Sequence, residues 1–291
     1  MVMRSGWVLV VWLGWFGHSA AASDGSRPGD STSPLSESQS EAGYVIGIVP
    51  QYEVRQIQRI WQPVLEQIRQ KTGIRLTLRG SPSIPAFEDE LDQAQFDFAY
   101  MNPYHFIRAH ERSGYRPLVR DTGRWLRGIL VVRSDSELQS VEALDGRAVA
   151  FPAPNALGAS LLMRAELGEK HGVKVLPRYV RSHSSVYLNV ATSHMDAGGG
   201  VQATLNRQSA QVQQSLRILY RTEKVAPHPL AVHPRVPADV ASRVREALLA
   251  MGETEDGKAL LARIPVKVIG DATLDDYRPL KAMKLDKYYE E

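Results

Sequence analysis

The 291-residue sequence contains no cysteine. This absence excludes disulfide bonds, thiolate metal sites, a cysteine nucleophile and a lipid-modified N-terminal cysteine. The sequence also has no run of five or more Lys and Arg residues, and its net charge of +3 is spread over mixed signs. Nucleic acid is therefore not an expected partner.

Motifs for catalysis and for metal binding are missing as well. The sequence has no HExxH, no GxSxG and no glycine-rich phosphate loop followed by Lys and Ser or Thr. His105 and His110 are five residues apart on a predicted helix, so they point in different directions and make a poor metal pair. We expect no enzymatic activity, no cofactor and no metal.

Long hydrophobic runs are rare, and the main one lies at the N-terminus. Arg4 precedes an apolar run from Trp7 to Gly17, and small residues follow it up to Ala22. This pattern predicts a cleaved signal peptide over 1–22 and export to the periplasm. The alternative is a transmembrane anchor, but the run has about half of the roughly 20 apolar residues that a span needs. Residues 23–43 are rich in Ser, Gly, Pro and acids and predict a disordered leader.

After the leader, short apolar strands alternate with amphipathic helices. The first unit has strands at 44–50, 74–80 and 96–101 and helices that end at Gly73 and Gly114. A second unit begins near residue 141, and its first long helix ends at Gly172. This order predicts an α/β fold with mostly parallel sheets, arranged as two lobes with a ligand cleft between them.

Six fragments in one order make the sequence similar to a known family. They are IGIVPQ, FDFAYMNPYHF, GYRPL, LDGRAVAFPAPNALGAS, SHSSVYLNV and MDAGGGV. The chain resembles the phosphate/phosphite/phosphonate substrate-binding proteins of ABC transporters, which are type II periplasmic binding proteins. The resemblance implies two Rossmann-like lobes joined by crossover strands: a first lobe over 44–128, a second over 129–224, and a return to the first over 225–291.

The resemblance also implies a ligand site at strand ends and helix N-termini that face the cleft, where unpaired N–H groups favour an anion. In the first lobe the candidates follow two strands: Gln51, Tyr52, Tyr100, Met101 and Asn102. Two alternatives are open, that Tyr52 packs on the following helix and that Asn102 serves only as a helix cap.

In the second lobe, a helix that begins near residue 155 or 156 would cradle the anion. Its candidates are Asn155, Ala156, Leu157, Gly158, Ala159 and Ser160. Phosphonate binders of the family carry a Ser/Thr-rich turn at this place. Here small apolar residues leave backbone N–H groups as the donors, with Ser160 as the one nearby hydroxyl.

Three more candidates start the next helix, and one follows a later strand. His183 matches a family histidine that reaches the ligand, and Ser184 and Ser185 could donate beside it; the alternative is a surface histidine between helix-capping serines. Asp196 either accepts a ligand proton or is a loop acid. His228, between two prolines, is expected to shape the hinge rather than to contact the ligand.

We therefore expect a monomeric periplasmic solute-binding protein that captures a small oxyanion and delivers it to an ABC permease. The alternative is a binding protein that signals its bound state to a membrane sensor kinase. Both use the same binding chemistry.

Overall fold

The computed structural model describes residues 43–264, 266–283 and 285–290. The predicted signal peptide over 1–22 and the leader up to residue 42 lie outside the described residues. Among the described residues, no helix combines the length and the hydrophobicity needed to cross a bilayer.

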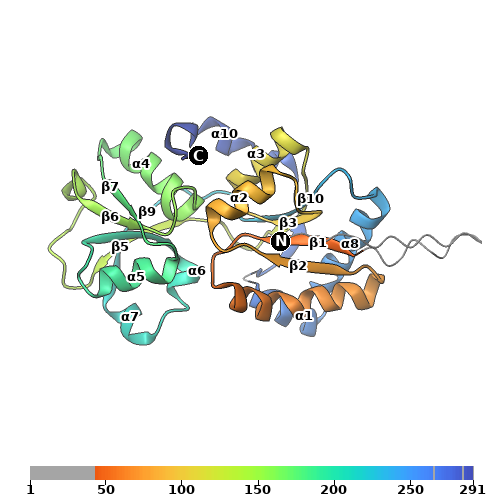
Figure 1. Cartoon of the computed structure of the whole chain (residues 1–291). Helices are drawn as coiled ribbons and strands as arrows, with labels where there is room; N and C mark the ends of the chain where they lie inside the picture. The colour runs from red at the N-terminus through yellow and green to blue at the C-terminus, as the bar shows by residue number, and fades with distance from the viewer. Residues whose placement is uncertain (1–42, 265, 284, 291) are drawn as a thin grey trace, which may run out of the picture. The chain divides into compact units, whose positions relative to one another are not determined.

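The first lobe is built on a six-stranded sheet (Figure 1). In spatial order its strands are β11 (Ile269–Asp271), β4 (Arg116–Asp121), β10 (Pro229–Val232), β3 (Phe98–Tyr100), β1 (Tyr44–Ile48) and β2 (Leu76–Gly80). Its helical segments are α1 (Val54–Thr72), α2 (Ile84–Asp92), α3 (Pro103–Ser113), α8 (Ala238–Met251), α9 (Glu255–Arg263), η3 (Leu274–Asp276) and α10 (Arg278–Ala282). The last segment, η4 (Leu285–Tyr288), contacts helices of both lobes.

Alternating side chains of this sheet pack on helices of its two faces. On β3, Phe98 packs in the core with α1, α8 and α9, whereas its neighbour Ala99 packs in the core with α2 and α3. On β10, Leu230 and Ala231 divide in the same way. This alternation follows from the two-residue period of a strand, and it leaves helices α2 and α3 on the face that leads to the pocket described below.

The second lobe is built on a five-stranded sheet. In spatial order its strands are β7 (Leu176–Tyr179), β6 (Ala148–Phe151), β8 (Ala197–Val201), β5 (Gly128–Arg133) and β9 (Leu216–Arg221). Its helical segments are η1 (Glu142–Leu144), the π-helical turn η2 (Leu157–Leu161), α4 (Leu162–His171), α5 (His183–Ala191), α6 (Gln202–Leu205) and α7 (Ala210–Gln214). On β5, Leu130 and Val132 pack toward α4, and Ile129 and Val131 pack toward α5.

Two segments connect the lobes, one between β4 and β5 and the other between β9 and β10. They meet at an antiparallel bridge between Leu126 and Val225, whose backbone groups exchange two hydrogen bonds of 2.9 Å. The bridge therefore places two crossing strands at the base of the pocket described below.

The expectation of mostly parallel sheets is wrong. Strand β1 pairs in parallel with β2 and β3, and β6 with β7 and β8. However, β5 is antiparallel to both of its neighbours, β10 is antiparallel to β3 and β4, and β11 is antiparallel to β4. Four of these five antiparallel pairs involve β5 or β10, the strands by which the chain enters a lobe from the other one. The fifth pair, β11 with β4, lies at the edge of the first sheet.

Candidate functional site

A small pocket lies between the two lobes. Strand ends, helix starts and the two crossing segments form its wall. The lining residues are Val49, Gln51, Ile84, Asn102, Leu126, Ala156, Leu157, Gly158, Ala159, His183, Val201 and His228.

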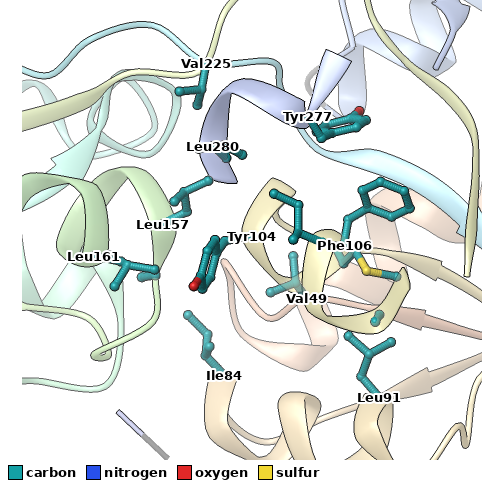
Figure 2. Close-up of a cluster of buried hydrophobic side chains, with 14 of the residues drawn as sticks. Val49, Ile84, Leu91, Tyr104, Phe106, Leu157, Leu161, Val225, Tyr277 and Leu280 are labelled. Atoms are coloured by element: carbon teal, nitrogen blue, oxygen red, sulfur yellow. The ribbon is translucent and has the colours of Figure 1, made fainter. Parts of the chain in front are cut away.

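One wall of the pocket is part of an apolar cluster that both lobes share. Figure 2 shows Leu157 and Leu161 on one side of this cluster and Val49, Ile84 and Tyr104 on the other. Val49, Ile84 and Leu157 are lining residues. The polar groups of the pocket therefore lie against a dry apolar wall, where hydrogen bonds are stronger than in water.

Asn102 joins the end of β3 to the start of α3. Its Oδ1 accepts the backbone N–H groups of Tyr104 at 2.9 Å and His105 at 2.8 Å, so Asn102 is the N-cap of α3, although the alternative that it serves only as a cap does not describe its place in the pocket lining. Its Nδ2 donates to the carbonyl of Asn155 in the second lobe at 3.1 Å. Asn102 thus caps a helix, lines the pocket and bonds across the lobes at once.

The helix mouth in the second lobe runs from Ala156 to Ala159. Ala156 is the N-cap, and its carbonyl accepts from Ser160 N at 2.7 Å and from Leu161 N at 3.2 Å, which makes the first turn π-helical. Residues Leu157 to Ala159 supply the N–H groups that a first helical turn leaves without an intrahelical acceptor. These residues line the pocket, and a helix start of this kind suits an anion.

Glycines in the sheet allow this helix mouth to sit close to the strands. A Cβ on Gly128 of β5 would lie 1.9 Å from the carbonyl oxygen of Gly158, and a Cβ on Gly199 of β8 would lie 1.9 Å from that of Ala159. These glycines thus permit a close backbone approach, and the backbone that approaches them is the helix start at Gly158 and Ala159.

His183 starts helix α5 and is only 5% exposed, so the sequence alternative of a surface histidine is wrong. The ring lines the pocket, and its Nδ1 is buried without a hydrogen-bond partner among the described residues. Burial lowers the pKa of His183 to about 4. The ring is therefore neutral at neutral pH, with one donor and one acceptor nitrogen.

His228 also lines the pocket, although the sequence suggested a hinge role only. Its Nε2 lies 2.7 Å from Nε2 of Gln51, and its ring stacks on Tyr100 at 5.3 Å. Since an amide nitrogen can only donate, the ring accepts at Nε2. Burial, together with the nearby His105 and His183, lowers the pKa of His228 to about 3. The sequence did not predict this position of His228, because the flanking Pro227 and Pro229 are more typical of a hinge than of a strand.

A third buried histidine lies next to the pocket lining. Nε2 of His105 lies 2.8 Å from Oε1 of Glu88 and 2.8 Å from Nδ2 of the lining residue Asn102. Over residues 43–264, 266–283 and 285–290, no group of three or more His, Asp or Glu is arranged to hold a metal ion.

A family model covers most of this architecture. The model of the ABC-transporter phosphonate periplasmic substrate-binding proteins matches residues 46–277. The chain belongs to this family. The structural comparisons below agree with the type II periplasmic binding fold that the phosphonate-binding family implies.

Solved structures of other binding proteins share the fold at low sequence identity. A binding protein component of an ABC phosphonate transporter from Pseudomonas aeruginosa has a TM-score of 0.75 at 17% identity, over 84% of this chain and 86% of that chain. PhnD1 from Prochlorococcus marinus, in complex with methylphosphonate, has a TM-score of 0.76 at 13% identity, over 84% and 98%. A Xanthomonas citri protein bound to chloride ion has a TM-score of 0.68 at 19% identity, over 84% and 98%. A comparison with the curated proteins gave no match.

In this phosphonate-binding family member, three first-lobe candidates lie behind the pocket wall rather than in it. Tyr52 packs partly buried beside helix α1, with the guanidinium of Arg207 4.8 Å from its ring centroid. Tyr100 stands between Trp61 and His228, and Met101 is fully buried. Tyr100 therefore supports the pocket by stacking on His228.

Two helix-mouth candidates have other partners. Asn155 is 1% exposed, and its side chain bonds to both backbone groups of Glu290, at 2.6 Å and 3.0 Å. The hydroxyl of Ser160 lies 3.3 Å from Nε of Arg164. Ser160 is not among the residues that line the pocket.

The remaining candidates of the second lobe face outward. Ser184 is exposed, and the hydroxyl of Ser185 lies 2.9 Å from that of Ser182, the N-cap of α5. Asp196 is exposed and pairs with Arg147 at 2.9 Å. The structure thus favours the loop-acid alternative for Asp196, because a carboxylate outside the pocket cannot accept a ligand proton inside it.

Proposed function

We propose that this chain captures a small phosphorus oxyanion of the phosphonate, phosphite or phosphate type in the pocket and delivers it to an ABC importer. The observation that carries the proposal is the helix mouth, where Leu157, Gly158 and Ala159 line the pocket at the first turn of a helix. Orphan N–H groups and the positive end of a helix dipole together favour an oxyanion. Family membership and the methylphosphonate held by the Prochlorococcus relative support the same ligand class.

Ligand-dependent thermal stability tests the proposal. A ligand that binds only the folded state raises its stability by about 2.7 kcal/mol at a hundredfold excess over Kd. Mature protein, freed of bound ligand by partial unfolding and refolding, is heated with methylphosphonate, phosphite, phosphate, sulfate or small carboxylates. We expect a rise in Tm with at least one phosphorus oxyanion, and no rise with any of them would contradict the proposal.

A pair of variants connects the stabilisation to the pocket. His183→Ala removes a buried polar group of the wall and should weaken the best ligand about tenfold, as the loss of one strong hydrogen bond does. His194→Ala replaces an exposed histidine after helix α5 and serves as the matched control. Equal affinities for the two variants would remove His183 from the proposed site.

Delivery to a permease is part of the same proposal. Neighbouring genes for a permease and an ATPase would support import, whereas a neighbouring sensor kinase would support the signalling alternative. Export is expected through the signal peptide over 1–22.

A further inference from the structure

The charge of the pocket wall sets what the pocket can hold. None of its lining residues is Asp, Glu, Lys or Arg. Its four polar side chains are two amides, Gln51 and Asn102, and two imidazoles, His183 and His228. Burial holds the pKa of His183 at about 4 and that of His228 at about 3, so both rings are uncharged at neutral pH.

Positive potential in the pocket therefore comes from backbone. The helix that begins at Leu157 continues without a break from η2 through α4 to His171, and the nine-residue helix α5 begins at His183. Both starts line the pocket. Each helix N-terminus carries about half an elementary charge, so the two together supply about one. That potential matches one negative charge and leaves a second one without compensation.

A buried ring nitrogen of the pocket wall also has no hydrogen-bond partner among the described residues. His183 lines the pocket and is 5% exposed, and its Nδ1 has no partner among the described residues. A neutral imidazole offers one bare nitrogen in addition to its N–H. A buried ring with this capacity favours a ligand that brings a hydroxyl, since an unmet buried polar group is costly.

We propose that the pocket selects a singly charged oxyanion that keeps one hydroxyl group, with its charged oxygens on the Leu157–Ala159 N–H groups and its hydroxyl on the His183 ring. Fully ionised dianions are discriminated against. This inference rests on the proposed function and narrows its ligand class to monoanions such as hydrogen methylphosphonate.

Other titratable and charged groups pack around the pocket, but none of them is a lining residue. They are His105 with Glu88, Asp121 with Arg124, Tyr100, and Tyr52 with Arg207. Burial raises the pKa of Tyr52 and of Tyr100 above the usual value, so both phenols are protonated up to pH 9. Any titration of the protein itself would act on every ligand alike, and a second ligand controls for it.

Calorimetric titrations between pH 6 and pH 9 test the inference with methylphosphonate and dimethylphosphinate. The phosphinate anion carries one charge at every pH in this range and has no hydroxyl, whereas methylphosphonate loses its hydroxyl proton within the range. We expect the Kd of methylphosphonate to rise about tenfold per pH unit above its second ionisation, as the binding-competent fraction falls. Dimethylphosphinate should bind more weakly at pH 6 and change less than about twofold across the series.

The outcomes separate this inference from the proposed function. Methylphosphonate that binds as tightly at pH 9 as at pH 6 would overturn the selection of a monoanion and leave phosphonate binding intact. Parallel losses for both ligands would also overturn it, because the protein would then be the titrating partner. Failure of every phosphorus oxyanion at every pH would instead refute the proposed function. If phosphate alone binds, phosphate and dimethyl phosphate form the matched pair.

A variant of His183 tests whether its ring accepts the hydrogen bond from the ligand's hydroxyl group. His183→Ala should weaken methylphosphonate at pH 6 about tenfold and dimethylphosphinate much less, because only the first ligand brings a hydroxyl. His194→Ala is the control, and far-UV circular dichroism checks folding. An equal loss for both ligands would remove His183 as the acceptor, and the wild-type pH series does not depend on this variant.

Discussion

Acidification from pH 7 to pH 5 should destabilise the ligand-free protein through His183 and His228. Both rings are buried in the pocket wall, and burial lowers their pKa values from 6.5 to about 4 and about 3. Between those values and 6.5 the unfolded chain binds more protons than the folded one. The free energy of unfolding therefore rises with pH in this window and falls on acidification.

The magnitude follows from the pKa differences. The value pH 5 lies about 1.5 units below the unfolded-state pKa of 6.5, so each ring is mostly charged in the unfolded chain. In the folded state each ring is still mostly neutral at this pH. One unit corresponds to about 1.36 kcal/mol, so each histidine lowers the free energy of unfolding by about 2 kcal/mol, and the two by about 4 kcal/mol. A loss of this size is a large part of the stability of an ordinary domain.

Urea unfolding at pH 7, 6 and 5 measures the effect. Wild type is compared with His183→Gln, which keeps a polar side chain but cannot take up a proton in this range, and with the exposed-site control His194→Gln. The loss between pH 7 and pH 5 should be about 2 kcal/mol smaller in His183→Gln than in wild type. Equal losses in all three proteins would refute the reasoning, because His183 would then be charged in the folded state or solvated.

Two further predictions concern stability outside the imidazoles. Gly128→Ala would place a methyl group 1.9 Å from the Gly158 carbonyl oxygen, so we expect urea unfolding to show a free energy of unfolding about 3 kcal/mol lower. Gly43→Ala is the neutral control, because its added Cβ would have no neighbour closer than 3.6 Å. Asp121→Asn disturbs a buried carboxylate that accepts the N–H groups of Gly123, Lys267 and Val268 at 2.8 to 3.0 Å, and should cost about 2 to 4 kcal/mol. The exposed Asp135→Asn is the control and should leave the stability nearly unchanged. No loss in Gly128→Ala would mean that the helix mouth can move, and no loss in Asp121→Asn would mean that its acceptors are dispensable.

Local patterns predicted the elements that position the pocket. Gly73, Gly114 and Gly172 were expected to end helices, and each stands at a helix C-cap with φ near +70°. The start of the second-lobe helix was expected near residue 155 or 156, and Ala156 is its N-cap. These helix ends depend on the backbone conformation within one turn, so they can be predicted from the local sequence alone.

Strand β10 shows where local patterns fail. It has four residues, begins with Pro229, and lies between β3 and β4 inside the first sheet. A proline usually argues against an interior strand, but it is tolerated at the first strand residue. Because β10 was not recognised, His228 beside it was assigned to a hinge instead of to the pocket.

Side-chain partners that are distant in sequence were the second limit. Asn155 bonds to the backbone of Glu290, 135 positions later, and Asp196 pairs with Arg147, 49 positions earlier. Both residues have polar side chains that would suit an anion site. Nothing in their local sequence shows that these side chains already bond to a distant residue. Only the tertiary structure removes them from the lining.

The pocket lining contains no hydroxyl side chain and no charged one. Because Gly128 and Gly199 admit the backbone of Gly158 and Ala159 directly onto β5 and β8, the helix start is held by the sheet. The N–H groups of this helix start are then fixed in position by the backbone and can bind a ligand as a preorganised set of donors. With no hydroxyl and no charged group to select the ligand, discrimination falls to the buried rings of His183 and His228, whose neutrality distinguishes a ligand that keeps a proton from one that has lost it.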